Sequence, residues 1–299
     1  MTSHVVVAAI RGGLGNQMFQ YAAGRALASR LGVELKLDLS WFSSVPCGAT
    51  PRRFMLDAFP NINIVEATGR ECESLIYAPG SFFARLLRWP RRYAQSYYVE
   101  PHFGYWEGFE QIVSPAYLLG YWQNERYFSG FAEIIRHDFG FPPLPSGVVK
   151  EVAGHIRGSR HAVAVHIRRG DYVSNPSTFQ WHGLCVLDYY YAALEVIAAQ
   201  IGSAPELFLF SDDPGWVREN FDTRGMSSVV LDFQAHVDAP CYDMHLMSLC
   251  THHVIANSSF SWWGAWLSGG NGVICAPNRW FADERRKYDN PSPYAWVRL

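Results

Sequence analysis

Two series of apolar runs that alternate with helix-like segments constrain the fold more than any other feature of this sequence. The first series opens with the β-branched run HVVVAAI at 4–10, which the glycine-rich turn RGGLG at 11–15 follows. Apolar residues then recur near helical spacing across 16–32, and VELKLDLS at 33–40 alternates like a second strand. A strand, a glycine turn, a helix and a strand within about 35 residues predict a βαβ unit with parallel strands.

The second series is longer and lies in the C-terminal half. It opens with HAVAVHI at 161–167, and LDYYYAALEVIAAQIG at 187–202 is typical of a helix. ELFLFSDD at 206–213 has the pattern of a strand, and PGWVRENF at 214–221 that of a helix with proline at its start. The alternation continues through SSVVLDF, YDMHLMSLCTH, HVIANSS, FSWWGAWLS and GVICAPNRWF. Strands that alternate with helices predict a parallel sheet covered on both faces.

The segment FGFPPLPSG at 139–147 contains three prolines and separates the two series. We therefore predict an α/β protein with two Rossmann-like domains, residues 1–145 and 150–299, whose parallel sheets face a central cleft. Ligands of such sheets bind beyond the carboxyl ends of the strands. The polar residues that follow each apolar run are therefore the candidates for a site.

Composition limits the classes of function. Hydrophobic residues make up 49% of the 299 residues and charged residues 17%, which supplies large cores and argues against disorder. The formal net charge is −2, so no broad basic field favours nucleic-acid binding. The six cysteines include no CxxC pair and no zinc-like spacing, as is typical of reduced thiols in a cytosolic protein.

No transmembrane segment is expected, because the sequence has no run of about 18 apolar residues. The apolar run before Arg11 lacks a cationic leader, so a signal peptide is not expected either. The segment 81–93 interleaves four arginines with phenylalanine, leucine and tryptophan. It fits a surface helix packed on its domain, or a patch that contacts an anionic membrane. We expect a cytoplasmic protein, with peripheral contact to the inner face of the membrane as the open alternative.

The glycine turn after the first apolar run is a candidate anion site. Glycines permit close backbone approach, and the N-terminus of the following helix offers N–H groups to an anion. The turn is not a dinucleotide fingerprint, because Met18 replaces its last glycine, and no Gly-Lys-Ser/Thr of a Walker loop follows. A plain turn would not need the amide side chains beside it, so the candidate ligands here are Gly15, Asn16 and Gln17.

The stretch HIRRGDY at 166–172 follows the first apolar run of the second series. Arginine presents a planar fork of donors that suits phosphate oxygens, and it stays charged in a dry site. Arg168 and Arg169 therefore predict an anion site. The alternative is an ion pair with Asp171 that braces two loops, although one aspartate cannot neutralise both arginines.

Two further polar stretches follow later apolar runs. Asp212 and Asp213 are adjacent, so their side chains diverge and shared metal coordination is not favoured. One of them could cap the helix that begins at Pro214, and the other could accept hydrogen bonds from a base such as guanine. The second stretch lies where a predicted strand ends and a helix begins, a place that suits phosphate binding, and it contains Ser258, Ser259 and Ser261.

The remaining aromatic and histidine residues do not predict a ligand or metal site. The three tryptophans of 260–268 stand at helical spacing and fit domain core better than a sugar platform. His252 and His253 open an apolar run in which neighbours point to opposite faces, and no HExxH-type spacing occurs. We predict no metal site.

Together these stretches resemble the bacterial α-1,2-fucosyltransferase family. The match rests, in order along the chain, on GLGNQMFQYA, LDLSWF, GYWQNERYF, HIRRGDY, FSDD and NSSFSWWGAWL. The resemblance implies an inverting, metal-independent glycosyltransferase of the GT-B type, with GDP-β-L-fucose as donor and no cofactor. It implies an acceptor glycan, such as an O-antigen, that ends in galactose and reacts through the 2-hydroxyl.

The resemblance also implies roles for single residues. Arg168 would contact the diphosphate and act in catalysis with His166 nearby, and Asp171 is the third catalytic candidate. Asp212 or Asp213 would hold guanine or ribose. Other donor contacts would come from Gly15, Asn16, Gln17, Arg169, Ser258, Ser259 and Phe260. The base that takes the acceptor proton is open among Asp38, Glu125, Asp171 and His166, and a mechanism that relies little on a base is also possible.

Two other classes of function stay open from the sequence. One is a non-catalytic protein of the same fold that binds a glycan or a nucleotide. The other is a GT-B glycosyltransferase that uses a different sugar nucleotide.

Overall fold

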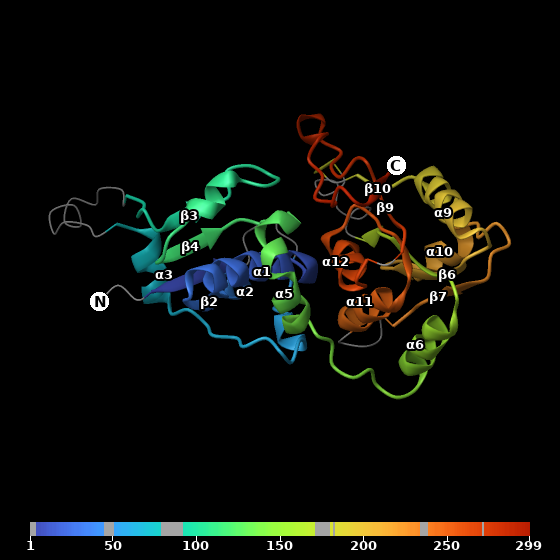
Figure 1. Ribbon diagram of the computed structural model, residues 1–299, viewed down its shortest axis with the longest axis horizontal. Helices are drawn as coiled ribbons and strands as arrows, with labels where there is room; N and C mark the ends of the chain where they lie inside the picture. Colours follow the sequence, from blue (N-terminus) through green and yellow to red (C-terminus); the bar gives the residue numbers. More distant parts are fainter. Residues whose placement is uncertain are drawn as a thin grey trace. The chain divides into compact units, whose positions relative to one another are not determined.

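The computed structural model of the chain (Figure 1) describes residues 4–44, 51–78, 92–170, 180–181, 183–233, 239–270 and 272–299. The chain divides into two compact units, Met1–Gly140 and Phe141–Leu299. The division falls within the proline-rich segment 139–147. Asp171 and most of the segment 81–93 lie outside the described residues, so the hypotheses on them stay predictions.

The first unit contains a four-stranded parallel sheet in the order β2-β1-β4-β3 (Figure 1). Its strands are β1 (Val5–Ala9), β2 (Glu34–Asp38), β3 (Tyr97–Val99) and β4 (Ala116–Leu119). Its helices are α1 (Leu14–Leu31), α2 (Ser40–Ser43), α3 (Gly69–Ile76) and α5 (Ala132–Asp138). Short 3₁₀ turns are η1 (Leu56–Ala58), η2 (Glu107–Gln111), η3 (Glu125–Tyr127) and η4 (Ser129–Phe131). The predicted βαβ unit is β1, α1 and β2.

Helix α1 packs closely on strand β1. A Cβ atom added to Gly24 would lie 2.9 Å from the Cβ atom of Ala8, so glycine permits this approach of helix and strand. The helix ends at Gly32, whose φ of 64° is left-handed and whose N–H bonds back to the carbonyls of the last turn. This is the C-cap that the sequence predicts.

The second unit contains a six-stranded parallel sheet in the order β10-β9-β8-β5-β6-β7. Its strands are β5 (Ala162–Ile167), β6 (Glu206–Ser211), β7 (Ser228–Val230), β8 (His252–Val254), β9 (Ile274–Ala276) and β10 (Val297–Arg298). Its helices are α6 (Val148–Gly158), α9 (Leu187–Ile201), α10 (Pro214–Asn220), α11 (Ala239–Leu249) and α12 (Ser259–Leu267), with the 3₁₀ turn η5 (Glu284–Arg286). Both sheets are parallel in all their pairings, which confirms the predicted α/β class.

The order of the second sheet reverses beside β5. From β5 the chain adds β6 and then β7 on one side, and it returns to add β8, β9 and β10 on the other. In an open α/β sheet, ligands bind at the carboxyl ends of the strands where this reversal occurs. The fold therefore places the expected site beyond the ends of β5 and β8.

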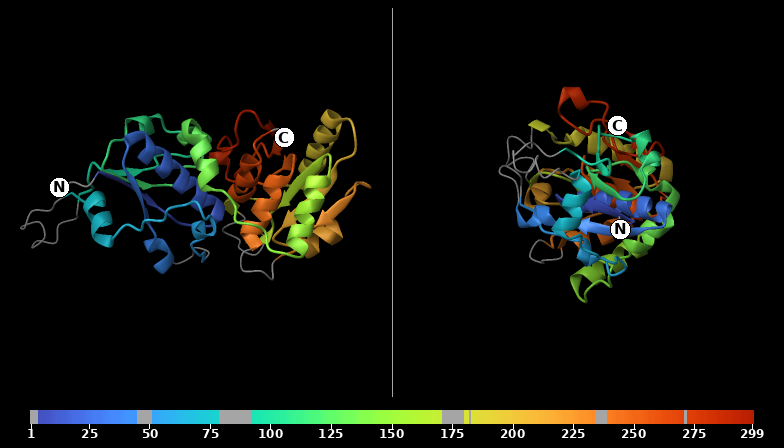
Figure 2. Two further views of the ribbon diagram at one scale, coloured as in Figure 1. Left: turned by 60° about the horizontal axis from the view of Figure 1, so that its bottom comes forward. Right: turned by 90° about the vertical axis from the view of Figure 1, so that its left-hand side faces the viewer.

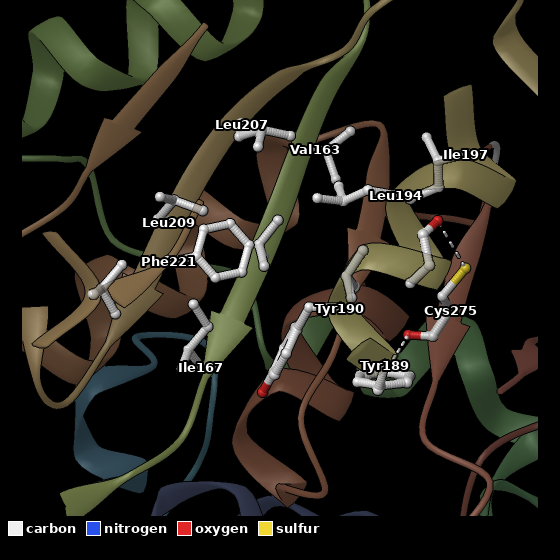
Figure 3. Packing of buried hydrophobic residues seen from close by; sticks show 14 residues of the cluster. Val163, Ile167, Tyr189, Tyr190, Leu194, Ile197, Leu207, Leu209, Phe221 and Cys275 are labelled. Carbon is white, nitrogen blue, oxygen red and sulfur yellow. Dashed lines mark hydrogen bonds between the residues drawn. The ribbon is translucent and has the colours of Figure 1, made fainter. Parts of the chain in front are cut away.

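Helices cover both faces of the second sheet, as predicted (Figure 2). On one face, Tyr190 and Leu194 of α9 pack against Val163 and Leu209 of the central strands (Figure 3). On the other face, apolar side chains of α6 and α11 pack against Ala164, Phe208 and Phe210. Alternate residues of β5 and β6 thus enter opposite cores, so both strands are buried on both faces.

None of the helices in the described ranges is both long enough and apolar enough to cross a membrane.

Candidate functional site

Three of the predicted polar stretches meet at one edge of the second sheet. Strand β5 pairs with β6 on one side and with β8 on the other, all parallel. Arg168 follows the end of β5, Asp212 follows the end of β6, and Ser258 follows β8 at the start of α12. All three therefore lie at the carboxyl edge, where the strand order reverses.

Arg168 is held by the carboxylate of Asp212. The Nη1 atom of Arg168 lies 2.9 Å from Oδ2 of Asp212, and the two side chains are 22% and 24% exposed. The other carboxylate oxygen, Oδ1, accepts a 2.8 Å hydrogen bond from the backbone N–H of Arg169. One aspartate thus contacts both arginines of the motif, through the side chain of one and the backbone of the other.

Arg169 and Asp213 have a different environment. Oδ1 of Asp213 accepts a 3.0 Å hydrogen bond from the backbone N–H of Trp216 and caps α10, whose first residue is Pro214. This confirms that one of the two aspartates caps this helix. The guanidinium of Arg169 stacks 3.7 Å above the ring of Trp216, and its Nε lies 3.5 Å from Oδ2 of Asp213. Arg169 thus packs on the start of α10.

His166 belongs to strand β5, two residues before Arg168, and is buried. Burial, and secondarily the positive charge of Arg168, lowers the pKa of His166 to about 3. Its ring lies 5.7 Å from the ring of Phe260, and within the described part of the chain its Nδ1 atom has no hydrogen-bond partner. His166 is therefore a neutral imidazole at neutral pH and a weak proton acceptor.

The serine stretch forms the start of α12. Oγ of Ser258 accepts a 3.3 Å hydrogen bond from the backbone N–H of Phe260, so Ser258 is the N-cap, and Ser259 is the first helical residue. Oγ of Ser261 donates to the carbonyl of Ser258 and is buried. The three tryptophans that follow are also buried, which confirms that they belong to the core: Trp262, Trp263 and Trp266.

Asn257 is a residue of this edge that the sequence reasoning did not select. It is buried, and its Nδ2 donates a 3.2 Å hydrogen bond to the carbonyl of Trp280. Its Oδ1 accepts a 3.5 Å bond from the thiol of Cys185. The asparagine thus ties the segment after β9 and the segment before α9 to the start of α12. Asn257 directly precedes Ser258, between a strand and a helix, and this position is the sequence signal that could have marked it as a site residue.

Asp243 is a second residue that the sequence reasoning missed. It lies in the first half of α11. Burial, and secondarily the charge of Asp232, raises the pKa of Asp243 to about 7. Asp243 is half-buried, and the available signal was an aspartate among the apolar residues of a predicted helix, since aspartate is mostly an exposed residue.

The glycine turn of the first unit has the conformation expected of a tight turn, but the side-chain amide of Gln17 is already hydrogen-bonded to backbone groups. Gly12 has a left-handed φ of 80°, Gly13 is the N-cap of α1, and Gly15 is buried in its first turn. The Gln17 side chain is fully buried: Nε2 donates to the carbonyls of Gly12 and Arg53, both at 2.8 Å, and Oε1 accepts from the N–H of Met55 at 2.9 Å. Gln17 thus joins the turn to the segment at 53–55, and its contact with a donor stays a prediction.

Asn16 connects the turn to the loop after β4. Its Oδ1 accepts a 2.7 Å hydrogen bond from Nε2 of Gln123, which belongs to the stretch GYWQNERYF. In that loop Trp122 is buried with a left-handed φ of 54°, and Glu100 accepts its backbone N–H at 3.1 Å. A tryptophan in this region is strained, and such strain is typical of functional loops.

Asp38 and Glu125, two candidate bases, also belong to the first unit. Oδ2 of Asp38 accepts a 2.6 Å bond from the hydroxyl of Tyr117, and Oδ1 accepts a 2.9 Å bond from the N–H of Ser40. Burial acts to raise the pKa of Asp38, but these bonds outweigh it and the pKa is lowered. Asp38 is thus a fixed anion. Glu125 is half-buried and opens η3.

Among the described residues, no group of three or more histidine, cysteine, aspartate or glutamate side chains is arranged to hold a metal ion. His253 is buried, and its Nε2 lies 2.9 Å from the carbonyl of Met247, which makes it part of the core.

Comparison with known proteins identifies full-length relatives. The family model described as glycosyl transferase family 11 matches residues 108–299. The chain is 35% identical to an α-1,2-colitosyltransferase of Escherichia coli, over 99% of each chain. It is 30% identical to the O-antigen biosynthesis glycosyltransferase WbnK of Escherichia coli, over 93% of this chain and 95% of the relative. Among solved structures, the fold is similar to that of the FUT1 protein of Arabidopsis thaliana in complex with GDP, with a TM-score of 0.50, 12% identity, and coverage of 92% of this chain and 70% of that one.

Proposed function

The chain belongs to glycosyl transferase family 11, has the α/β architecture of GT-B enzymes and is a glycosyltransferase, and we propose that the sugar it transfers is L-fucose. The proposed donor is GDP-β-L-fucose. The proposed acceptor is the 2-hydroxyl of a terminal galactose in an oligosaccharide or O-antigen glycan, with inversion at the anomeric carbon. The observation that carries the proposal is Arg168, held by Asp212 at the switch point of the second sheet.

Arg168 suits the chemistry of this donor. Cleavage of the bond between fucose and phosphate develops negative charge on the departing GDP, and a cation fixed in advance stabilises that charge. The guanidinium of Arg168 is mostly buried and fixed by an ion pair, so little reorganisation is needed when the donor binds. The start of α12, with Ser258 and Ser259, lies at the same sheet edge and is the proposed site for the phosphate end of GDP.

The acceptor hydroxyl must also lose a proton as it attacks. His166 is a weak candidate for this base because its pKa is lowered to about 3. Asp38 is a weak candidate because both of its oxygens already accept hydrogen bonds and its pKa is lowered. The proposal therefore leaves Glu125, Asp171 or a mechanism that relies little on a base.

A second donor is favoured by one specific observation. The relative that is 35% identical over 99% of both chains is named a colitosyltransferase. Colitose is L-fucose without its 3-hydroxyl group, so GDP-colitose would present the same diphosphate to Arg168. The two donors differ only in the sugar, which carries a 3-hydroxyl group in GDP-fucose and lacks it in GDP-colitose.

A donor screen tests the proposal. We expect the protein to release GDP from GDP-fucose in the presence of lactose, and linkage analysis of the product to show fucose α-1,2-linked to galactose. Turnover with GDP-colitose but not with GDP-fucose would select the second donor. Competition among GDP, UDP and CMP should show the tightest binding for GDP. Binding of UDP alone would contradict the assignment of a guanine nucleotide as the donor. Binding of GDP-fucose without turnover would favour a non-catalytic protein.

A further inference from the structure

We propose that Asp212 is a positioning residue that sets the guanidinium of Arg168 for the donor diphosphate, and is not a ligand of the nucleotide base. This inference rests on the proposed function, because it takes Arg168 as the residue that binds a diphosphate. The sequence alone does not show which of the two adjacent aspartates, Asp212 or Asp213, has this role.

Both oxygens of the Asp212 carboxylate point to the loop that follows β5. Oδ2 lies 2.9 Å from Nη1 of Arg168, and Oδ1 accepts the backbone N–H of Arg169 at 2.8 Å. The carboxylate therefore fixes the side chain of one arginine and the backbone beside it. Strands β5 and β6 are direct neighbours, so this bridge joins the ends of two paired strands.

Gly170 shows how closely the loop fits this carboxylate. A Cβ atom added to Gly170 would lie 2.2 Å from Oδ2 and 2.9 Å from Cγ of Asp212. Any side chain at this position would displace the carboxylate from its place beside Arg168. The glycine of the RRGD stretch is thus explained by the approach of Asp212, and its φ is not in the left-handed range.

Electrostatics favours an indirect role for Asp212. A carboxylate beside a diphosphate repels it, so a direct contact between Asp212 and the phosphates would oppose binding. A carboxylate that pairs with an arginine instead restricts the many conformers of that side chain before the donor arrives. A guanidinium has five N–H donors, so pairing with one carboxylate is compatible with binding a second anion.

A double-mutant cycle on GDP binding tests this role, with isothermal titration of the full chain. Asp212→Asn keeps an oxygen for the N–H of Arg169 and removes the charge that holds Arg168. We expect it to weaken GDP binding by about tenfold, as for directly coupled contacts. In the Arg168→Ala background, we expect Asp212→Asn to change the affinity by less than about twofold. Additive losses in the two backgrounds would overturn the inference.

Inosine diphosphate separates positioning from recognition of the base. It lacks the 2-amino group of guanine, which an aspartate ligand of the base would contact. If Asp212 acts through Arg168, Asp212→Asn weakens GDP and inosine diphosphate by the same factor, and the ratio of their affinities stays that of the unmodified protein. A ratio that moves toward one in this variant would overturn the inference.

A steric variant and a matched control complete the test. Gly170→Ala keeps every charge and displaces the carboxylate of Asp212, so we expect it to lower the affinity for GDP. This loss should disappear in the Arg168→Ala background. An unchanged affinity of Gly170→Ala would overturn the inference. Asp289→Asn is the control, because Asp289 pairs with Arg286 at 2.8 Å with similar exposure, and GDP binding should stay unchanged. Failure of the unmodified protein to bind GDP would instead contradict the proposed function.

Discussion

At the scale of single residues, surroundings decide what a side chain does. Asp212 and Asp213 are identical in type and adjacent, yet one contacts two arginines and the other caps α10. Gln17 lies beside Asn16 in a predicted ligand turn, yet its amide bonds to three backbone groups. Burial and partners, which a sequence does not display, separate the members of each pair.

Asp243 supplies a prediction on pH at this scale. Its pKa of about 7 in the folded protein lies above the ordinary value near 4, so the folded state binds the proton more tightly than the unfolded state. Its contribution to the free energy of unfolding therefore falls as pH rises from about 4 to about 7. The side chain in Asp243→Asn stays neutral at every pH. We therefore expect the melting temperature of this variant, relative to that of the unmodified protein, to be higher at pH 8 than at pH 5.

Thermal melts of both proteins across that range check this expectation. The exposed Gln200 offers a control without a titratable group, since Gln200→Ala should shift the melting temperature equally at both pH values. A constant difference between Asp243→Asn and the unmodified protein would contradict the assignment.

At the scale of elements, the apolar run around an element and its place in the alternation of strands and helices decided what the sequence could predict. β5, β6 and α9 span six, six and fifteen residues, and their apolar patterns predicted them. β3, β4 and β10 have three, four and two residues and were not predicted, whereas β7, β8 and β9, with three residues each, were predicted because they lie in a series of apolar runs that alternate with helix patterns. The site motifs were found because they follow apolar runs that are visible in the sequence, whereas the bridge from Asp212 to Arg168 depends on the pairing of β5 with β6.

The face of α9 on the sheet carries a prediction of stability. Leu194 is 2% exposed and packs among the side chains of the central strands (Figure 3). Leu194→Ala leaves a cavity in this core, and we expect the free energy of unfolding to fall by about 2–5 kcal/mol. Gln200 lies exposed on the same helix, so Gln200→Ala should change it by less than about 0.5 kcal/mol. Denaturant titration measures both, and equal effects would contradict the burial of Leu194.

At the scale of the whole molecule, the alternation of strands and helices predicted two parallel-sheet units, and the structure has both. The motifs that resemble the fucosyltransferases lie in both units, and the family match covers residues 108–299. The resemblance predicted a terminal galactose as acceptor, but the natural glycan that carries it was not predicted, because the residues at 42–110 carry no motif with a known chemistry.

The central claim is that Arg168 stabilises the charge on the departing nucleotide, and one rate measures it most directly. Transfer of fucose from GDP-fucose to lactose should fall by about 10²–10³-fold or more in Arg168→Ala, as on loss of one fixed donor to a developing anion. Arg218→Ala removes the arginine of an exposed Arg–Asp pair and should keep the rate of the unmodified protein. Turnover of a folded Arg168→Ala variant near that rate would contradict the claim.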